Sequence, residues 1–264
     1  GERTIADELR DAGYATGMIG KWHVGAAPHF HPMRRGFQEV FGFLGGGHDY
    51  HRATGGEREN TAPLDRNGRP APETEYLTDA FTREAAGFIR RHRSHPFFLY
   101  LAYNAPHSPN HSTERYLRRV EHIAYPDRML YAALNVALDD GVGAVLAELD
   151  AARLRENTLV VFLSDNGGRK DGADNRPLRG FKGMLHEGGV RVPFAMSWPA
   201  ALRPGARYDQ PVSALDILPT ALAAAGVERA SGRPLDGVNL LPYLTGRNNS
   251  APHAALYWRT AGGR

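Results

Sequence analysis

The chain is predicted to fold as an α/β protein, with a mostly parallel β-sheet covered by helices on both faces. Short apolar segments alternate with longer amphipathic ones along its 264 residues. The segment 97–102 is continuously apolar, as expected of a parallel strand that is buried on both faces. The 30 glycines and 18 prolines indicate long structured loops. Strands and helices that alternate in this way favour one sheet between two layers of helices.

The N-terminal part is predicted to begin with a helix and a strand. Thr4 can cap a helix that extends to Arg10, and Gly13 can end it. A strand-like run then occupies residues 15–19. The later stretch 48–75 is polar and rich in glycine and proline. We expect it to be a loop or an insertion rather than a linker between domains.

Two helices flank the predicted strand at 97–102. Thr78 can cap the first helix, and side chains spaced three or four residues apart then share one face. The apolar face of this helix consists of Phe81, Ala85, Phe88 and Ile89. The second helix is expected over about residues 127–151. Its apolar stripe consists of Leu130, Leu134, Leu138, Val142, Leu146 and Leu149.

The C-terminal half is predicted to add two strands and one helix. Apolar runs at 158–163 and 192–198 indicate the strands. Asp216 can cap the helix, which carries Pro219 in its first turn, where no amide hydrogen bond is lost. Gly226 can end this helix.

The composition favours a globular protein. Hydrophobic residues make up 42% of the chain and charged residues 23%, so one large core can form. No apolar run approaches the ~20 residues of a membrane span. The chain contains no cysteine, which excludes disulfides and thiolate metal sites. We expect residues 1–246 to form one α/β domain and residues 247–264 to begin a C-terminal subdomain.

The charged residues are more informative by type than by sum. The net charge is +3 and the arginines are scattered without a nucleic-acid-binding motif, so we expect no nucleic-acid partner. Only three of the 32 basic residues are lysines: Lys21, Lys170 and Lys182. Lysine carries a compact charge that can approach one oxygen and can give up a proton. Lys21 and Lys182 are therefore candidates for chemistry, with chance placement on a solvated surface as the alternative.

Two motifs at predicted strand ends suggest hydrolysis of an anionic ester. Asp165 and Asn166 follow an apolar strand and offer adjacent side-chain oxygens. Lys21 and His23 lie two residues apart after another strand. An oxygen-ligand metal site together with a Lys/His pair is what such a hydrolysis needs.

A third motif, Asn104-Ala105-Pro106-His107, follows the predicted strand at 97–102. Sites in such sheets lie beyond the carboxyl ends of the strands, so the three motifs are expected to meet at one edge. Singly, each has a structural interpretation: an ordinary turn, a packed tryptophan with solvated neighbours, and a loop with a hydrogen-bonded histidine. Their joint occurrence at three strand ends favours a functional site.

Together these motifs resemble the type I sulfatases of the alkaline phosphatase superfamily, and they occur in that family's order. The segment 177–193, which contains Lys182, is similar to the family's second lysine segment. Residues 215–220 and 235–238 are similar to its late structural markers. The likeness covers nearly the whole chain and implies the alkaline phosphatase-like fold.

The resemblance implies a catalytic role for four residues. Lys21, Lys182 and His107 would stabilise the charge on the sulfate oxygens. His107 or Lys182 would protonate the leaving alcohol. His23 would lie beside the nucleophile and remove the hydroxyl proton whose loss expels sulfate.

The resemblance also implies a metal and substrate contacts. Asp165 and Asn166 would bind Ca²⁺, with Mg²⁺ as the alternative, and would supply part of a shell of roughly six to eight oxygens. His48 and Asp49 would contact the substrate, with a solvated insertion as the alternative. His186 would line the pocket near Lys182. Seven histidines receive no specific role and are expected to be surface or structural residues: His29, His31, His92, His95, His111, His122 and His253.

The sulfatase nucleophile is a formylglycine, made from a Cys or Ser near the N-terminus, and an acidic pair on the first strand completes the metal site. The chain contains neither a cysteine nor a Ser-x-Pro-Ser-Arg sequence. We therefore expect an internal fragment, truncated at both ends, whose missing N-terminal segment carries the formylglycine. The chain alone is then expected to be inactive. The resemblance further implies a formylglycine-generating enzyme as partner and a periplasmic or secreted location.

Three functions stay open at this point. The first is that of an arylsulfatase or carbohydrate sulfatase, a Ca²⁺-dependent hydrolase of sulfate monoesters in the intact protein. The second is a phosphomonoester, phosphodiester or phosphonate hydrolase of the same superfamily. The third is a non-catalytic binder of sulfated glycans or an inactive fragment.

Overall fold

The computed structural model describes residues 2–51, 53, 59–229 and 233–259. The chain divides into two compact units, Gly1–Leu154 and Arg155–Arg264. The boundary expected at residue 246 stays a prediction, and the segment that follows it lies partly outside the described residues.

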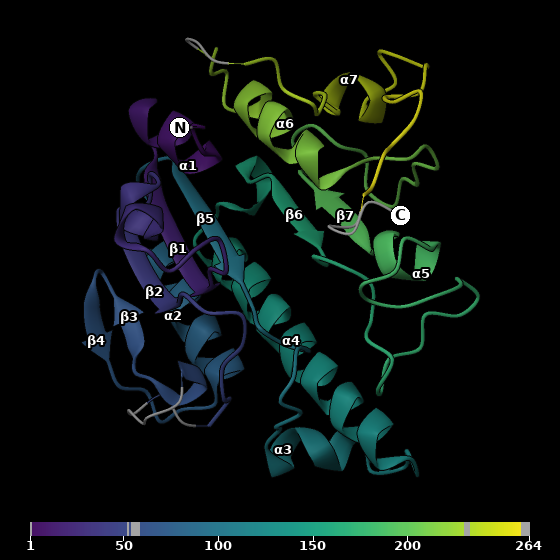
Figure 1. Ribbon diagram of the computed structural model, residues 1–264. Coiled ribbons are helices and arrows are strands. Elements are labelled where there is room, and N and C mark those ends of the chain that lie inside the picture. Colours follow the sequence, from purple (N-terminus) through teal and green to yellow (C-terminus); the bar gives the residue numbers. More distant parts are fainter. Residues whose placement is uncertain (1, 52, 54–58, 230–232, 260–264) are drawn as a thin grey trace. The chain divides into compact units, whose positions relative to one another are not determined.

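The first unit is built on a five-stranded sheet with the strand order β4-β3-β2-β1-β5 (Figure 1). Strand β1 (Ala15–Lys21) pairs in parallel with β2 (Glu39–Phe43) and with β5 (Phe97–Ala102). The hairpin of β3 (Leu64–Arg66) and β4 (Arg69–Ala71) continues the sheet in antiparallel fashion beyond β2. The α/β class is confirmed, and the sheet is mixed.

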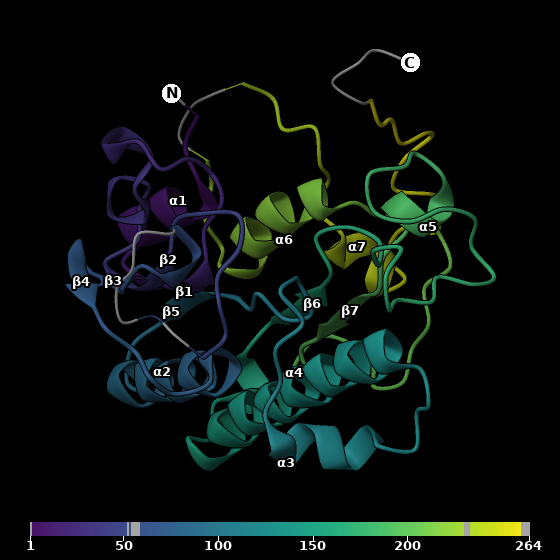
Figure 2. The ribbon, with the colours of Figure 1, turned by 60° about the horizontal axis from the view of Figure 1, so that its bottom comes forward.

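Helices cover both faces of this sheet, as predicted. The helix α1 (Ile5–Asp11) belongs to the buried cluster that contains Met18 of β1. The helix α2 (Leu77–His92) packs on the other face, in the cluster that contains Ile19. Successive residues of a strand point to opposite faces, which explains how these two neighbours reach different helices. Figure 2 shows α1 and α2 on opposite sides of the strands.

Capping decides where these two helices begin. Thr4 caps α1 as predicted: its hydroxyl accepts a hydrogen bond from the N–H of Asp7, whose carboxylate accepts one from the N–H of Thr4. The helix α2 begins at Leu77, so the predicted cap Thr78 lies inside its first turn. The carbonyl of Tyr50 accepts the N–H of Leu77 at 2.9 Å and replaces the expected side-chain cap.

The stretch 48–75, predicted as a loop or an insertion, contains the hairpin of β3 and β4. Asn67 and Gly68 form its turn, with φ angles of 55° and 81°. Positive φ at two consecutive positions is the geometry of a type I′ turn, which favours Asn-Gly. The side-chain oxygen of Asn67 also accepts the N–H of Val40 at 2.7 Å, so the turn is bonded to β2.

The helix α4 (Pro126–Ala151) corresponds to the long predicted helix and packs against α2 and α3 (Glu114–Leu117). Leu134 of α4 is fully buried in the cluster that also contains α2. The length and hydropathy of α4 would suffice to cross a membrane. The core helix of a globular protein can meet the same two criteria. Asp139 and Asp140 interrupt its apolar residues, so the sequence contains no continuous apolar run of membrane-spanning length here.

The second unit contains β6 (Val160–Leu163) and β7 (Phe194–Ser197), close to both predicted strands. They pair with each other in antiparallel fashion, whereas the sequence predicted a mostly parallel sheet without assigning the direction of each strand. Parallel neighbours need a crossover, usually a long helix, whereas the connection between these strands contains only one helix of four residues. The helices of this unit are α5 (Glu187–Val190), α6 (Ile217–Ala224) and α7 (Leu241–Leu244).

Asp216 is not the cap of α6 itself but belongs to a capping box one turn earlier, on the 3₁₀-helix Ala214–Asp216, where Ser213 is the cap. The side chain of Asp216 is fully buried and makes no capping bond to α6. Its carboxylate accepts the N–H groups of Ser213 at 2.7 Å and Val238 at 2.8 Å, and lies 2.9 Å from Nε2 of His253. Asp216 therefore joins three segments of the second unit and gives His253 a buried partner.

Replacement of Asp216 by alanine should destabilise the folded protein by about 3–5 kcal/mol, because three partly buried donors lose a fully buried acceptor. Asp209→Ala is the matched control, since Asp209 forms an exposed ion pair with Arg207. We expect it to change the free energy of unfolding by less than about 0.5 kcal/mol. Urea denaturation measures both values, and equal midpoints for the two variants would contradict the prediction.

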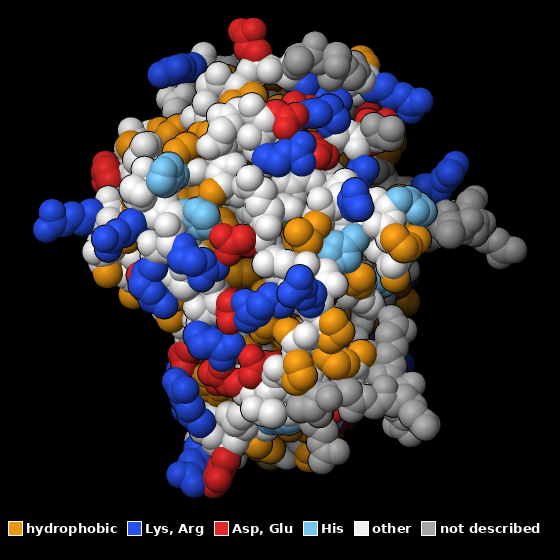
Figure 3. All heavy atoms as spheres, turned by 90° about the vertical axis from the view of Figure 1, so that its left-hand side faces the viewer, with side chains coloured by type: hydrophobic (Ala, Val, Ile, Leu, Met, Phe, Trp, Pro, Cys, Tyr) orange, Lys and Arg blue, Asp and Glu red, His pale blue; other side chains and the backbone are white. Residues whose placement is uncertain are grey.

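The charged surface is mixed in sign. On the face shown in Figure 3, basic side chains lie among acidic ones. Ion pairs of the first unit join Arg66 to Glu84 at 2.8 Å and Arg91 to Glu39 at 2.6 Å. Paired arginines of this kind do not form the clustered positive patch that nucleic-acid binding needs. The expectation of no nucleic-acid partner stays a prediction.

Candidate functional site

The first unit brings Lys21, His23 and His107 to the carboxyl ends of its parallel strands. Lys21 is the last residue of β1, and His23 follows it after one residue. His107 lies in the loop after β5, which pairs with β1. The N–H of His23 donates to the carbonyl of Leu44 at 3.1 Å, so the chain after β1 is bonded to the chain after β2.

Trp22 fixes the turn that presents His23. The indole is buried, its Nε1 donates to the carbonyl of Phe30 at 2.9 Å, and its ring lies edge-on against Phe37. His23 has a φ of 50°, in the left-handed region that few residues other than glycine adopt. Such a conformation persists only where the surroundings impose it, and it is common at functional sites.

Two consecutive glycines of the loop after β2 lie beside the imidazoles of the two histidines. A Cβ atom on Gly46 would lie 2.8 Å from Nε2 of His23, and one on Gly47 would lie 3.7 Å from the ring of His107. The two rings therefore lie beside adjacent residues of one loop. The sequence showed these glycines only as part of a glycine-rich run, since the contact depends on the pairing of β1 with β2.

Gly46→Ala should lower kcat by about tenfold or more, because the new methyl group overlaps the imidazole of His23 and must displace it. The displaced atom is the far end of a side chain, so folding should be little affected. Gly47→Ala is the matched control, since its methyl group would meet only ordinary van der Waals contacts. Both variants are made in the protein as its gene encodes it and assayed with an aryl sulfate, the substrate class that the resemblance implies. Equal rates for the two would contradict the prediction.

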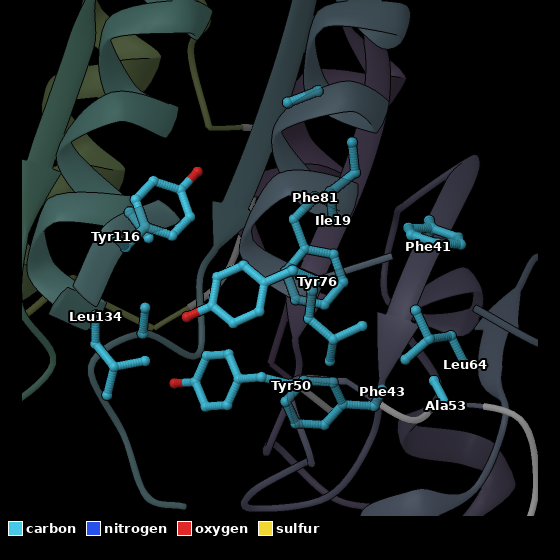
Figure 4. Close-up of a cluster of buried hydrophobic side chains, with 14 of the residues drawn as sticks. Ile19, Phe41, Phe43, Tyr50, Ala53, Leu64, Tyr76, Phe81, Tyr116 and Leu134 are labelled. Atoms are coloured by element: carbon cyan, nitrogen blue, oxygen red, sulfur yellow. The ribbon is translucent and has the colours of Figure 1, made fainter. Parts of the chain in front are cut away.

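Two buried tyrosines hold the loop that carries His107. The hydroxyl of Tyr50 donates to the carbonyl of His107 at 2.9 Å, and that of Tyr76 donates to the carbonyl of His111 at 3.1 Å. The two rings stack with centroids 5.5 Å apart, and Figure 4 shows both hydroxyls pointing the same way. Burial raises the pKa of Tyr76 to about 12, so its hydroxyl stays a donor at neutral pH.

The hydrogen bonding of His107 defines its tautomer. Its Nδ1 lies 2.8 Å from the carbonyl oxygen of Ser108, which can only accept. Nδ1 therefore carries the proton in the neutral ring. Nε2 is then the ring nitrogen that can exchange a proton with a substrate.

His48 and Asp49 differ in accessibility. His48 is 2% exposed, and its ring nitrogens lie 2.8 Å from the carbonyl of Asp49 and 2.9 Å from that of Ala62. Its ring also packs on Phe43. This arrangement holds the loop and leaves almost no surface for the predicted substrate contact. The Asp49 side chain is 18% exposed, and its Oδ1 accepts the N–H of His51.

In the second unit, the segment that contains Lys182 is bonded to the loop directly after Asn166. The N–H of Lys182 donates to the carbonyl of Gly168 at 3.0 Å. The amide of Asn175 accepts the N–H of Gly168 and donates to the carbonyls of Gly168 and Gly180. Asn175 was not a predicted site residue, because this bridge depends on the folded loop.

Asp165 and Asn166 lie directly after β6, with Asp165 exposed and Asn166 half-buried. Within the described residues, neither side chain has a hydrogen-bond partner. Two hard oxygen donors without a partner in the described part of the chain fit Ca²⁺, but they fill only part of its coordination shell. No group of three or more His, Cys, Asp or Glu residues in the described part of the chain could hold a metal.

His186 precedes α5 and is exposed. A Cβ atom on Gly180 would lie 2.9 Å from its Cβ, which places His186 beside the segment that carries Lys182. The second unit thus brings Asp165, Asn166, Lys182 and His186 into neighbouring loops. That these residues share one cleft with those of the first unit stays a prediction.

The comparison with known proteins now decides the family. The sulfatase family model matches residues 1–227. The chain belongs to the sulfatase family. It is 35% identical to the N-acetylgalactosamine-6-sulfatase of Sus scrofa, over 98% of this chain and 51% of that protein. It is 32% identical to the uncharacterised sulfatase YdeN of Escherichia coli (strain K12), over 98% of this chain and 50% of that protein. The chain thus spans about half the length of the curated relatives it matches.

Similar solved structures support this family assignment. Ps i-CgsB, in complex with k-i-k-neocarrahexaose, is 42% identical with a TM-score of 0.89, over 94% of this chain and 58% of that one. The PsFucS1 sulfatase from Pseudoalteromonas sp. is 26% identical with a TM-score of 0.76, over 92% of this chain and 55% of that one. A phosphonate monoester hydrolase from Silicibacter pomeroyi, 18% identical with a TM-score of 0.60, shares the fold alone. The predicted sulfatase membership and alkaline phosphatase-like fold are confirmed.

Proposed function

We propose that the protein to which this chain belongs hydrolyses a sulfate monoester on a carbohydrate. The sulfatase family match over residues 1–227 carries this proposal. A carbohydrate substrate is supported by the likeness to Ps i-CgsB, whose structure contains an oligosaccharide, and to the N-acetylgalactosamine-6-sulfatases. Phosphonate hydrolysis has weaker support, because that likeness extends to the fold only.

In this proposal, positive side chains bind the sulfate oxygens. Lys21 extends from the end of β1, and Lys182 from the loop bonded to Gly168. Their ammonium groups stabilise the charge that develops on these oxygens as the ester bond breaks. The imidazolium of His107, whose Nδ1 is bonded to a carbonyl, donates its Nε2 proton to the oxygen of the leaving alcohol. His23 takes up the hydroxyl proton of the nucleophile when sulfate leaves.

Asp165 and Asn166 would hold the metal, Ca²⁺ or Mg²⁺. When bound, the ion supplies positive charge at the sulfate oxygens. The proposed nucleophile is a formylglycine, made by a formylglycine-generating enzyme, in a part of the protein outside the present sequence. Asp49 contacts the substrate, and His48 positions the loop that carries Asp49.

The test is to express the protein as its gene encodes it, together with the formylglycine-generating enzyme. Sulfate release from k-i-k-neocarrahexaose and from para-nitrophenyl sulfate is then compared with phosphate release from para-nitrophenyl phosphate. We expect turnover of both sulfate esters. Faster hydrolysis of the phosphate ester, or no turnover of either sulfate ester, would contradict the proposed function.

A further inference from the structure

We propose that Asp49, His51 and His111, here called the Asp49 cluster, form a subsite for a hydroxyl-bearing sugar ring of an oligosaccharide substrate. The inference rests on the proposed sulfatase function and concerns a part of the substrate beyond its sulfate group. The sequence indicated no role for His51 and only a surface or structural role for His111.

The Asp49 cluster is tied to the loop that carries His107. Asp49 and His51 flank Tyr50, whose hydroxyl donates to the carbonyl of His107 at 2.9 Å. His111 lies four residues after His107 in the same loop. The loops after β2 and β5 therefore meet at the Asp49 cluster, and both belong to the first unit.

The contacts within the Asp49 cluster fix its polar groups. Oδ2 of Asp49 lies 3.5 Å from Nδ1 of His111, and Oδ1 accepts the N–H of His51 at 2.8 Å. The two imidazole rings lie 6.0 Å apart and nearly parallel, at 26°. The side chain of His111 is 41% exposed and that of Asp49 18%, so a ligand can reach both.

Polar atoms of the same segment lack partners from the described part of the chain. Nδ1 of His111 is buried and makes no hydrogen bond, since 3.5 Å from a carboxylate is too long for one. Oδ1 of Asn110 and Oγ1 of Thr113 are also buried and unbonded. Buried polar atoms in folded proteins are nearly always hydrogen-bonded. Several buried polar atoms without hydrogen bonds in one short segment indicate polar partners that the described part of the chain does not supply.

The chemistry of the Asp49 cluster selects hydroxyl groups over a second sulfate. A carboxylate accepts hydrogen bonds from sugar hydroxyls but repels an anionic group. Imidazole nitrogens can donate to or accept from the same hydroxyls. A site built to bond hydroxyl groups discriminates strongly against ligands that lack them.

Asp49→Asn tests the subsite with little change in shape, because the amide oxygen can still accept the N–H of His51. Asp65→Asn is the matched control. Asp65 also pairs with a histidine, His31, at 3.1 Å, and it also accepts a backbone N–H, that of Gly68, at 2.8 Å. His111→Ala removes the other side of the Asp49 cluster. All variants are made in the protein as its gene encodes it.

The measured quantity is the ratio of kcat/KM for k-i-k-neocarrahexaose to kcat/KM for para-nitrophenyl sulfate, which has no sugar ring. Asp49→Asn and His111→Ala should lower this ratio by about 10–100-fold, as expected for lost hydrogen bonds to a charged or buried partner. Asp65→Asn should leave the ratio unchanged. An unchanged ratio in both cluster variants would overturn the subsite, because a merely structural role lowers both rates equally.

Calorimetric titration of the hexasaccharide separates this inference from the proposed function. We expect Asp49→Asn and His111→Ala to weaken binding of the hexasaccharide by about tenfold or more, whether or not the ester is cleaved. Absent binding by the wild type, or equal affinity of wild type and variants, would overturn the subsite. Intact, cluster-dependent binding without any sulfate release would overturn the proposed function alone.

Discussion

Exchange of Lys182 for arginine should lower the turnover of a sulfate ester by about 10²-fold or more, although the positive charge is kept. An ammonium group is compact and approaches one oxygen, whereas a guanidinium is a wide planar fork that cannot give up its proton. The N–H of Lys182 is bonded to the carbonyl of Gly168, so the backbone cannot easily withdraw to make room. The measurement is kcat and KM with para-nitrophenyl sulfate, for the protein as its gene encodes it.

Lys170→Arg is the matched control for this exchange. Lys170 is exposed and lies two residues after Gly168, in the same region of the second unit. Its replacement should leave kcat within about twofold of the wild type, as for an ordinary surface substitution. If Lys182→Arg also kept near-full activity, lysine would not be needed at that position, and the scarcity of lysine in this chain would have no catalytic meaning.

Local sequence signals predicted those elements whose ends are set by neighbouring residues. Thr4 and Asp7 form both halves of a capping box, and α1 begins where they place it. The start of α2 was predicted incorrectly, because the carbonyl that caps Leu77 belongs to Tyr50, far away in the sequence. Tertiary contacts therefore override a local cap such as Thr78.

The hairpin of β3 and β4 was missed although its sequence signal was present. Asn67-Gly68 is the strongest short-range sign of a tight hairpin. It lies in a stretch whose polar composition, with many glycines and prolines, led to the expectation of a loop or an insertion without strands of its own. The antiparallel pairing of β6 with β7 is a different case, because strand direction depends on the path of the chain between the strands.

In the candidate site too, features set by local sequence were predicted and features set by tertiary contacts were not. The positions of Lys21 and Asp165 at strand ends follow from the alternation of apolar and polar segments along the chain. The contact of Gly46 with His23 could not be predicted, since it depends on the loops that follow two paired strands. His48 has a side chain that could contact a substrate. However, it is buried, and both of its ring nitrogens lie within hydrogen-bond distance of backbone carbonyls. Residue type alone does not reveal whether a histidine is already hydrogen-bonded within the protein.

Asp165→Asn should weaken the binding of Ca²⁺ by more than about 100-fold in the protein as its gene encodes it. Loss of a group that only supports a metal ligand already costs about 10–100-fold, and Asp165 is a candidate ligand itself. Bound Ca²⁺ stabilises a folded protein by about 2.7 kcal/mol at a concentration 100 times its Kd. The wild type should therefore unfold at a higher temperature with Ca²⁺ than with a chelator, whereas Asp165→Asn should show this shift only at much higher Ca²⁺ concentrations.

Asp171→Asn is the control that separates a ligand from general charge. Asp171 is exposed and lies six residues after Asp165, so its replacement removes the same charge from the same region. Its titration with Ca²⁺ should match that of the wild type, because a negative charge outside the coordination shell contributes little through water and salt. Thermal unfolding reports binding independently of catalysis, so the comparison holds even if sulfate release is slow. Identical Ca²⁺ titrations for Asp165→Asn and the wild type would show that the metal does not bind at the end of β6.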